Sequence, residues 1–430
     1  MNRSARFFSL AALIALVVAF VPHVSAQSTV NLVLDGFSSG TVETNTLQGI
    51  VDSWNKANPG IQVKYIVEPD YGTTLNKNLA SGSLPDIFYV DSSLFLQLVS
   101  AGALLPVGDQ IDNANDFIPA LKDVFTPNGK FYCPPKDFST LALQVNNDML
   151  KAANISAPPK TWDEFTADAK ALTTKDVAGT ITPNDPARWL AFLYQAGGTL
   201  TDANFTKMTV NSPEGLAALK FYTDLYANGY AKKPSDVGAG WPGEAFEKGK
   251  AAMIFEGNWL IGDAKNNAPK LNYSSVPLPA GPKGQASMVF TVCYGVAAQG
   301  KHTAEATKFL NYLVSPDSMK TFTEAVGVMP ARQSLAADWL TKYPDLKVYL
   351  DSAQYAHRWA FPAGFQPVLD DISKQIDLVF QGQETPEDAL KEIETTGNAV
   401  LAKNAAGASA TAAATMGATM APTMAATASS

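Results

Sequence analysis

Residues 30–36 (VNLVLDG), 61–67 (IQVKYIV) and 87–90 (IFYV) decide the fold class, because each has the pattern of a β-strand. Apolar residues alternate along the first two segments, and the third is continuously apolar. Helical patterns lie between them, and Asn58-Pro59-Gly60 forms a turn before the second strand. The order β-α-β-α-β predicts an α/β fold with a largely parallel sheet and helices on both faces.

Helix starts are easy to recognise in the later chain. Thr161-Trp162-Asp163-Glu164 is a capping box, in which the Thr hydroxyl and the Glu carboxylate each accept a hydrogen bond from a free amide. Three further sites place a capping hydroxyl before Pro at the first helical position: Ser212-Pro213, Ser315-Pro316 and Thr385-Pro386. The α/β pattern therefore continues through the chain, without an internal repeat.

The length of 430 residues exceeds that of an ordinary single domain, so two lobes are expected. Hydrophobic residues make up 46% of the chain and charged residues 17%, which is enough to bury a core in each lobe. Residues 404–430 are the exception, because they are mostly Ala, Thr, Met and Ser. We expect them to form a disordered tail, since they cannot bury enough surface to fold.

Residues 1–26 have the features of a secretory signal peptide. Arg3 and Arg6 precede an apolar run from Phe7 to Val21, and Val24-Ser25-Ala26 is a small-x-small cleavage site. No Cys stands at the cleavage site, so attachment through a lipid on an N-terminal Cys is not expected. The sequence therefore predicts an exported protein, in a periplasm or at the outer face of the cell envelope.

Net charge limits the partners. The formal net charge is −8, and it becomes −10 once the signal peptide, whose only charged residues are Arg3 and Arg6, is removed. An acidic surface disfavours nucleic acid and anionic lipid.

Cys133 and Cys293 are the only cysteines. In an exported chain they form either one disulfide or two free buried thiols, and the residues alone leave both alternatives open.

One segment matches a catalytic motif by its letters but not by its context. Gly36-Phe37-Ser38-Ser39-Gly40 matches the G-x-S-x-G pattern of a serine hydrolase, with Ser38 as nucleophile. Only His302 and His357 remain as bases after signal removal, and His302 lies in a polar turn. The segment fits better as a ligand-approaching loop at the carboxyl end of the first strand, where open α/β sheets bind ligands.

Cofactor motifs are equally weak. Gly238 to Gly243 matches G-x-G-x-x-G by letter, but no strand precedes it and it contains Trp241-Pro242. Two separated cysteines and two mature histidines form no transition-metal motif, although a carboxylate-lined cation site stays open. We therefore expect no cofactor and no catalytic residues.

Four tryptophans lie outside helical stripes: Trp189, Trp241, Trp259 and Trp359, each close to Gly, Pro or Arg. Flat apolar rings beside polar groups suit a sugar, which has an apolar C–H face and a polar hydroxyl rim. The alternative is that each ring fills its own lobe, since Trp is usually mostly buried.

Several longer segments resemble one family in combination. Residues 84–91 (LPDIFYVD), 158–165 (PPKTWDEF), 246–253 (FEKGKAAM), 257–259 (GNW) and 327–332 (GVMPAR) are similar to motifs of the extracellular solute-binding proteins of ABC importers, of the maltose-binding type. The resemblance covers nearly the whole mature chain, to about Leu401.

This resemblance implies a two-lobe periplasmic-binding-protein fold, with an interlobe cleft and hinge strands. The N-terminal lobe would comprise 27–138 and 296–342, and the C-terminal lobe 139–295 and 343–403. Cys133 and Cys293 would then lie beside two antiparallel hinge strands, which favours a disulfide if their Cα separation permits one.

The resemblance also implies ligand contacts. Trp259 corresponds to a stacking Trp, and Trp189 and Trp241 to other contacts of the C-terminal lobe. The N-terminal lobe and the hinge would supply Ser38, Ser39, Tyr71, Asp91, Ser139 and Tyr294. Arg332 and Arg358 would donate to hydroxyls or to a phosphate, with a structural role as the alternative for Arg332.

The function implied is capture of a sugar by lobe closure and delivery to the membrane subunits of an ABC importer, by a monomer without enzymatic activity. Ligand would stabilise the closed form to the extent that it binds that form better. A glycerol-phosphate-type ester is the alternative ligand. A secreted serine hydrolase using Ser38 is the alternative from another class.

Overall fold

The computed structural model describes residues 29–37, 40–362 and 364–419, with side chains as far as Ala405. The expected signal peptide and the predicted contacts Ser38 and Ser39 lie outside the described residues. No helix in the described part of the chain is long and apolar enough to cross a membrane.

The described strands form an 11-stranded sheet with a main order of β2-β1-β3-β9-β4-β7-β5-β6. The strands are β1 Val30–Gly36, β2 Ile61–Val67, β3 Ile87–Asp91, β4 Pro135–Asn146, β5 Ala178–Ile181, β6 Ala231–Lys232, β7 Ala251–Gly257, β8 Tyr273–Val276, β9 Ser287–Val296, β10 Met329–Pro330 and β11 Ala356–Arg358. Strands β1, β2 and β3 pair in parallel, so the predicted β-α-β-α-β start is confirmed.

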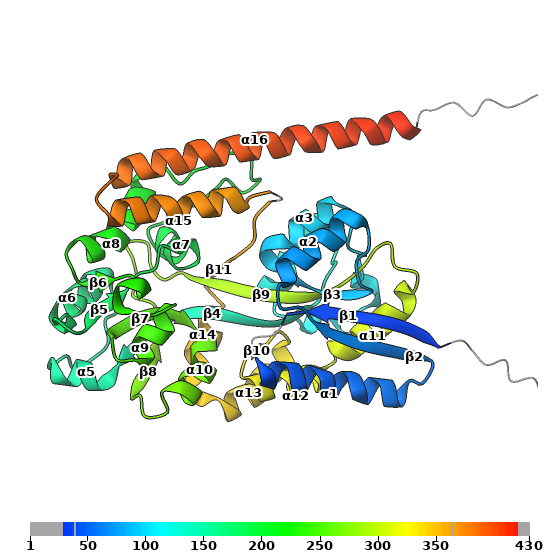
Figure 1. Cartoon of the computed structure of the whole chain (residues 1–430), viewed down its shortest axis with the longest axis horizontal. Coiled ribbons are helices and arrows are strands. Elements are labelled where there is room, and N and C mark those ends of the chain that lie inside the picture. The colour runs from blue at the N-terminus through cyan, green and yellow to red at the C-terminus, as the bar shows by residue number, and fades with distance from the viewer. Residues whose placement is uncertain (1–28, 38–39, 363, 420–430) are drawn as a thin grey trace, which may run out of the picture.

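Helices cover the sheet on both sides (Figure 1). The first eight are α1 Thr41–Ala57, α2 Tyr71–Ser81, α3 Ser92–Ser100, α4 Pro119–Val124, α5 Asn147–Ala152, α6 Trp162–Leu172, α7 Pro186–Gln195 and α8 Pro213–Ala227. The others are α9 Pro242–Glu247, α10 Trp259–Asn267, α11 Thr303–Leu313, α12 Pro316–Val326, α13 Ala336–Lys342, α14 Lys347–Ser352, α15 Gln366–Phe380 and α16 Pro386–Thr419.

The predicted helix caps are present. The hydroxyl oxygens of Thr161, Ser212 and Ser315 each accept a hydrogen bond from the amide three residues later. Thr385 accepts one from Asp388 in the same way, at the start of α16. These bonds satisfy amides that a helix leaves free in its first turn.

Helix α16 is longer than expected. Its backbone is helical to Thr419, whereas the sequence predicted disorder from residue 404. The physical reason is propensity: the segment is rich in Ala, the best helix former, and a helix needs no packed core to satisfy its own backbone. Residues 420–430 of the expected tail lie outside the described residues.

Strands β4 and β9 cross between two bodies of the molecule (Figure 1). They are antiparallel, and β9 pairs with β3 through residues 292–296 and with β4 through residues 289–293. One hydrophobic core contains residues of 32–138 and 289–360 together with Ala142, and a second contains other residues of 141–288 together with 361–401. We call the two bodies the N-lobe and the C-lobe.

This arrangement matches the expected two-lobe fold. The expected boundaries within the chain stay predictions. Tyr349 and Ala360 pack with the first core, although the predicted boundary assigns residues 343–403 to the C-lobe.

A disulfide joins Cys133 to Cys293, with a Cα separation of 5.5 Å. Both residues are fully buried. Cys293 lies on β9 opposite Val90 of β3 and Pro135 of β4, so the bond sits where three strands meet. Pro134 and Pro135 cannot donate backbone hydrogen bonds, and the disulfide attaches the beginning of β4 where the ladder is weakest. The pairing expected from the resemblance is confirmed.

Candidate functional site

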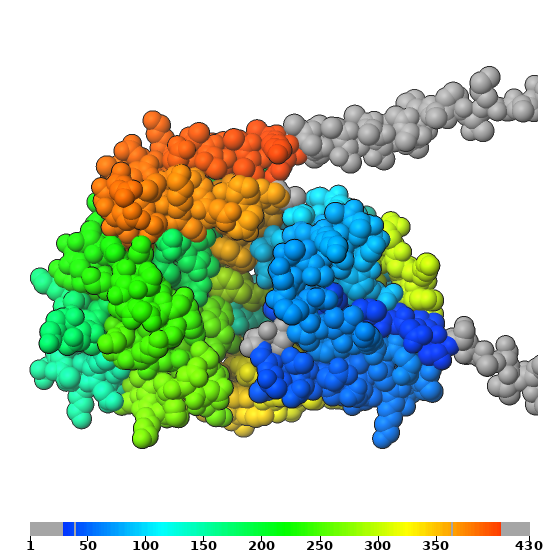
Figure 2. All heavy atoms as spheres, in the orientation of Figure 1, coloured from blue at the N-terminus to red at the C-terminus, as the bar shows by residue number. Residues whose placement is uncertain are grey.

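A hollow separates the two lobes in the space-filling view (Figure 2). One cavity of about 210 Å³ is lined from both lobes, by Ser93 of α3 and by C-lobe residues that include Asp185 and Trp359. A second cavity of about 480 Å³ lies in the C-lobe and is lined by Asp185, Arg188 and Trp241, among others. The two cavities adjoin, because Asp185 lines both.

The C-lobe cavity lies at the carboxyl ends of parallel strands. Pro183 follows β5 closely, and Lys233 follows β6 directly. Strands β5 and β6 pair in parallel, as do β5 and β7. Loops at such an edge are the usual ligand-binding position in open α/β sheets.

An aromatic row begins at Trp359, which lines the smaller cavity. Its other members are Phe361, Phe290 and Trp259. The ring centroids of Trp259 and Phe290 are 5.6 Å apart, and those of Phe290 and Trp359 are 5.9 Å apart. Phe361 meets Trp359 edge-on at 4.8 Å. The rings of Trp259, Phe290 and Trp359 are only partly buried, so they leave apolar surface for a flat ligand.

The ring of Trp259 lies very close to the backbone of Gly257. Trp259 begins α10 directly after β7, and a Cβ at Gly257 would lie 2.2 Å from its ring. Only glycine leaves room for the indole at that position. The G-x-W pattern therefore has a steric cause.

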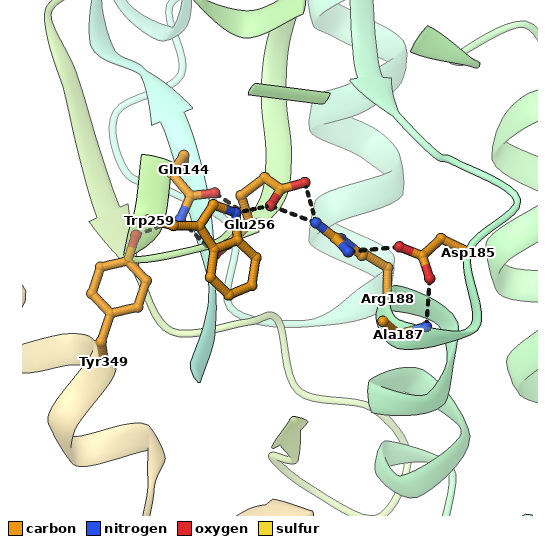
Figure 3. Close-up of polar contacts among 7 residues, drawn as sticks. All are labelled: Gln144, Asp185, Ala187, Arg188, Glu256, Trp259 and Tyr349. Carbon is orange, nitrogen blue, oxygen red and sulfur yellow. Dashed lines mark hydrogen bonds and ion pairs between the residues drawn. The ribbon is translucent and has the colours of Figure 1, made fainter. Parts of the chain in front are cut away.

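A buried network of polar groups holds Trp259 (Figure 3). Its indole Nε1 donates to Oε2 of Glu256 over 2.8 Å. Nη2 of Arg188 lies 2.7 Å from both carboxylate oxygens of Glu256. Nη1 of Arg188 donates to Asp185 over 2.6 Å, and Asp185 also accepts from the amide of Ala187 at the start of α7.

The electrostatics of the network follow from its burial. Glu256 is fully buried, and burial raises the pKa of its carboxyl, while Arg188 and the indole N–H favour the ionised form. Burial also disfavours the charge of Arg188, but the carboxylates of Glu256 and Asp185 outweigh it and raise the pKa of the guanidinium. Arg188 is therefore a cation with two anionic partners.

The N-lobe presents a different set of groups. Phe37, next to β1, packs edge-on against Tyr71 and Tyr89, with centroids 5.6 and 5.3 Å away. Asp35 is buried, and its Oδ1 has no hydrogen-bond partner among the described residues. Burial, followed by the charge of Glu68, raises the pKa of Asp35 to about 6. A buried carboxylate oxygen without a donor is costly.

Several predicted contacts lie at or near the cleft. Trp259 belongs to the aromatic row, and Trp241 lines the C-lobe cavity. Ser139 of β4 lies opposite Phe290 of β9. Asp91 accepts hydrogen bonds from the amide and hydroxyl of Ser93, the N-lobe residue of the smaller cavity.

Two other predicted contact residues, Tyr71 and Tyr294, make contacts within the N-lobe. The Tyr71 hydroxyl donates to the carbonyl of Tyr89, and its ring supports Phe37. Tyr294 is 2% exposed and packs edge-on against Tyr89 within the N-lobe core.

The structure changes the interpretation of Trp189 and Arg332. Trp189 is completely buried in the C-lobe core, because it lies on α7 and faces inward. Arg332 is 1% exposed and donates to the carbonyls of Val314, Asn113 and Asp112. Neither has a surface that a solute would reach, so neither is among the contacts that we propose. For Arg332 the structural alternative fits.

Arg358 lies in another cavity of about 210 Å³, together with Tyr194 and His357. His357 stacks face to face on Tyr194, with ring centroids 3.8 Å apart. Phe361 of the aromatic row also lines this cavity, whereas Asp185 lines only the two described above.

Sequence reasoning missed Arg188, Glu256, Asp185 and Phe290 as candidate site residues. A usable signal existed for Glu256, which is the one charged residue in the apolar strand Ala251–Gly257 and stands at its carboxyl end. Asp185-Pro186 is a helix cap of the same type as those recognised elsewhere. No local pattern indicates that Arg188 and Glu256 form an ion pair.

Two lobes joined by crossing strands, with aromatic and polar groups at strand ends between them, define the class of two-lobe solute-binding proteins. The chain belongs to the bacterial extracellular solute-binding protein family, whose model matches residues 49–348.

Individual relatives are similar over most of their length. The arabinooligosaccharide-binding protein of Bacillus subtilis is 26% identical, with 82% of this chain and 82% of that protein covered. The sn-glycerol-3-phosphate-binding periplasmic protein of Salmonella paratyphi A is 24% identical, with 83% and 89% covered. The structure of the GacH receptor of Streptomyces glaucescens has a TM-score of 0.78 and 25% identity, with 87% and 99% covered.

Proposed function

We propose that this protein is the extracellular substrate-binding component of an ABC importer, and that it captures a mono- or oligosaccharide by closing its lobes. The observation that supports this most is the aromatic row beside a buried carboxylate–guanidinium network. Rings of this kind pack on the C–H face of a sugar, while polar groups around them bond its hydroxyls. The B. subtilis relative is named for an arabinooligosaccharide, and the GacH receptor was solved in complex with acarbose.

The charges favour a neutral sugar over a phosphate ester. A phosphate is bound best by a cation whose charge is not already balanced by carboxylates. The charge of Arg188 is already balanced by the carboxylates of Glu256 and Asp185, and Arg332 is buried among backbone carbonyls. Arg358 lies in a cavity with Tyr194 that neither Asp185 nor Ser93 lines. The glycerol-phosphate alternative is therefore the weaker one, even though one relative is named for that ligand.

The mechanism needs no covalent chemistry. Solute bound to the C-lobe cavity would meet Ser93 and Asp91 of the N-lobe when the lobes approach, and so stabilise the closed form. Strands β4 and β9 would bend at the crossover. Export through the predicted signal peptide, action as a monomer and docking to membrane subunits belong to the same proposal.

A thermal-shift screen of mono- and oligosaccharides, with glycerol 3-phosphate in parallel, tests the function. A true ligand at a hundredfold excess over its Kd adds about 2.7 kcal/mol of stability. Calorimetry then measures the affinity of each hit. A shift with glycerol 3-phosphate alone, and with no sugar, would contradict the sugar proposal.

A further inference from the structure

Trp259 is useful as a binding surface only if its ring has one orientation. The side chain has a single polar atom, Nε1, and that atom donates to Glu256. Phe290 packs edge-on against the indole at 72°, and Gly257 lies against its ring. The hydrogen bond adds a directional restraint to these two packing contacts. Glu256 lies near the end of β7, and Trp259 is the first residue of α10.

Glu256 is itself fixed from two directions. Both of its carboxylate oxygens accept from Nη2 of Arg188 in a charge-assisted contact. Its backbone amide donates to Oε1 of Gln144, and Nε2 of Gln144 donates back to the carbonyl of Glu256. The same Nε2 lies 2.6 Å from the hydroxyl of Tyr349 on α14 (Figure 3).

The guanidinium of Arg188 connects this network to the cavities. Its Cζ lies 5.5 Å from the centroid of the Trp259 ring, and Asp185 holds its other side. Asp185 lines both cavities, while Glu256 has no exposed surface. Glu256 therefore cannot touch a solute directly and can affect binding only through its partners.

We propose that Glu256 is a positioning residue, which sets the orientation of the Trp259 indole for solute binding. The proposal rests on the proposed function, because it assumes that solute packs on Trp259. Glu256 acts through two bonds, one to the indole and one to Arg188, which lies beside the same ring. Loss of the carboxylate charge loosens both, since a neutral amide offers Nη2 of Arg188 one acceptor oxygen and no charge.

The orientation is measured without any solute. Protein labelled with 5-fluorotryptophan is examined by ¹⁹F NMR, and the Trp259 resonance is identified by its absence in Trp259→Phe. In Glu256→Gln we expect this resonance to shift and broaden while the other tryptophan resonances keep their positions. Asp116→Asn is the matched control, because it removes a carboxylate beside another buried arginine, Arg332 of the N-lobe. An unchanged Trp259 resonance in Glu256→Gln would overturn the proposal.

A double-mutant cycle tests the effect on binding, with whichever sugar gives the strongest thermal shift as probe. Glu256→Gln should weaken binding roughly tenfold in the wild-type background, since a hydrogen bond to a charged group is involved. In the Trp259→Phe background, which lacks the indole N–H, the same change should weaken binding less than about twofold. Equal losses in both backgrounds would show that Glu256 acts through general stability, and would reject the proposal.

Failure of the two proposals can be told apart. If no sugar binds the wild-type protein, the proposed function fails, and the ¹⁹F measurement still reports on the indole. If Glu256→Gln does not fold, Gln144→Leu removes the amide that fixes the Glu256 backbone and leaves the ion pair intact. A smaller shift of the Trp259 resonance is then expected, and its absence would count against the proposal.

Discussion

The hydroxyl of Ser92 donates a hydrogen bond to the carbonyl oxygen of Trp359 over 2.6 Å. Ser92 begins α3 in the N-lobe, whereas the ring of Trp359 belongs to the aromatic row. The amide of Trp359 donates to Val289 of β9, so the backbone of Trp359 is held from both sides. One ring of the candidate site therefore depends on contacts from two different elements.

Ser92→Ala should lower stability by about 1 kcal/mol, because a buried carbonyl loses its donor. It should also weaken sugar binding several-fold, since the Trp359 backbone becomes free to move. Urea unfolding and calorimetry check the two effects. Ser100→Ala on the same helix removes an exposed hydroxyl bond and serves as control. Equal binding by both variants would show that Ser92 has no influence on the site.

Replacing Trp259 should mainly lower sugar affinity, whereas replacing Trp189 should mainly lower stability. Trp259→Ala removes a partly exposed ring of the aromatic row, and we expect sugar affinity to fall about tenfold or more with a modest loss of stability. Trp189→Phe leaves a void in the C-lobe core and should cost about 1–3 kcal/mol of stability, with affinity nearly unchanged. The reverse pattern would place the ligand elsewhere.

Removal of the disulfide should be strongly destabilising. The double variant Cys133→Ala/Cys293→Ala loses a link between residues 160 apart, so we expect a loss of about 4 kcal/mol. Because both residues are fully buried, a reducing agent should react with the native protein only at the rate of unfolding. Urea denaturation and thiol labelling measure these quantities. Fast labelling of native protein would contradict the burial.

Asp35 should make stability depend on pH. Burial and Glu68 raise its pKa from an ordinary value of 3.8 to about 6, so the folded protein binds more protons than the unfolded one between these values. The resulting stabilisation is present in acid and is lost as the pH rises through about 6, at a cost of about 2–3 kcal/mol. Asp35→Asn should therefore be more stable than wild type at pH 8 and not at pH 4.

Glu68→Gln provides a second variant for this test, because it removes the neighbouring charge and leaves Asp35 in place. A smaller gain at pH 8 is expected. Unfolding by urea at the two pH values measures both variants. If Asp35→Asn is less stable than wild type at pH 8, the carboxylate makes a favourable contact there and the sign of the prediction is wrong.

The fold was predictable from the sequence because its signals are local. The strands at 30–36 and 61–67 follow from alternation, and the caps at Thr161 and Ser212 follow from short-range hydrogen bonding. The disulfide required the family resemblance, because spacing alone does not pair two cysteines.

The candidate site was only partly predictable, because its key contacts join distant residues. Arg188 and Glu256 are 68 positions apart, and no periodic pattern reports such a pair. Trp189 was interpreted as lying in a loop, although Asp185-Pro186 caps a helix and places this residue in its first turn. Recognition of that cap would have predicted an inward-facing ring.

Strand β9 lies between β3 and β4, although nearly two hundred residues separate it from β3 in the chain. A fragment that stops before residue 287 would leave β3 and β4 with bare edges, and such edges invite aggregation. Each lobe consists of more than one chain segment, so cleavage of a single peptide bond does not yield an intact lobe. Most of the polypeptide must therefore be present before the sheet of the N-lobe is complete, which makes its closure depend on long-range contacts.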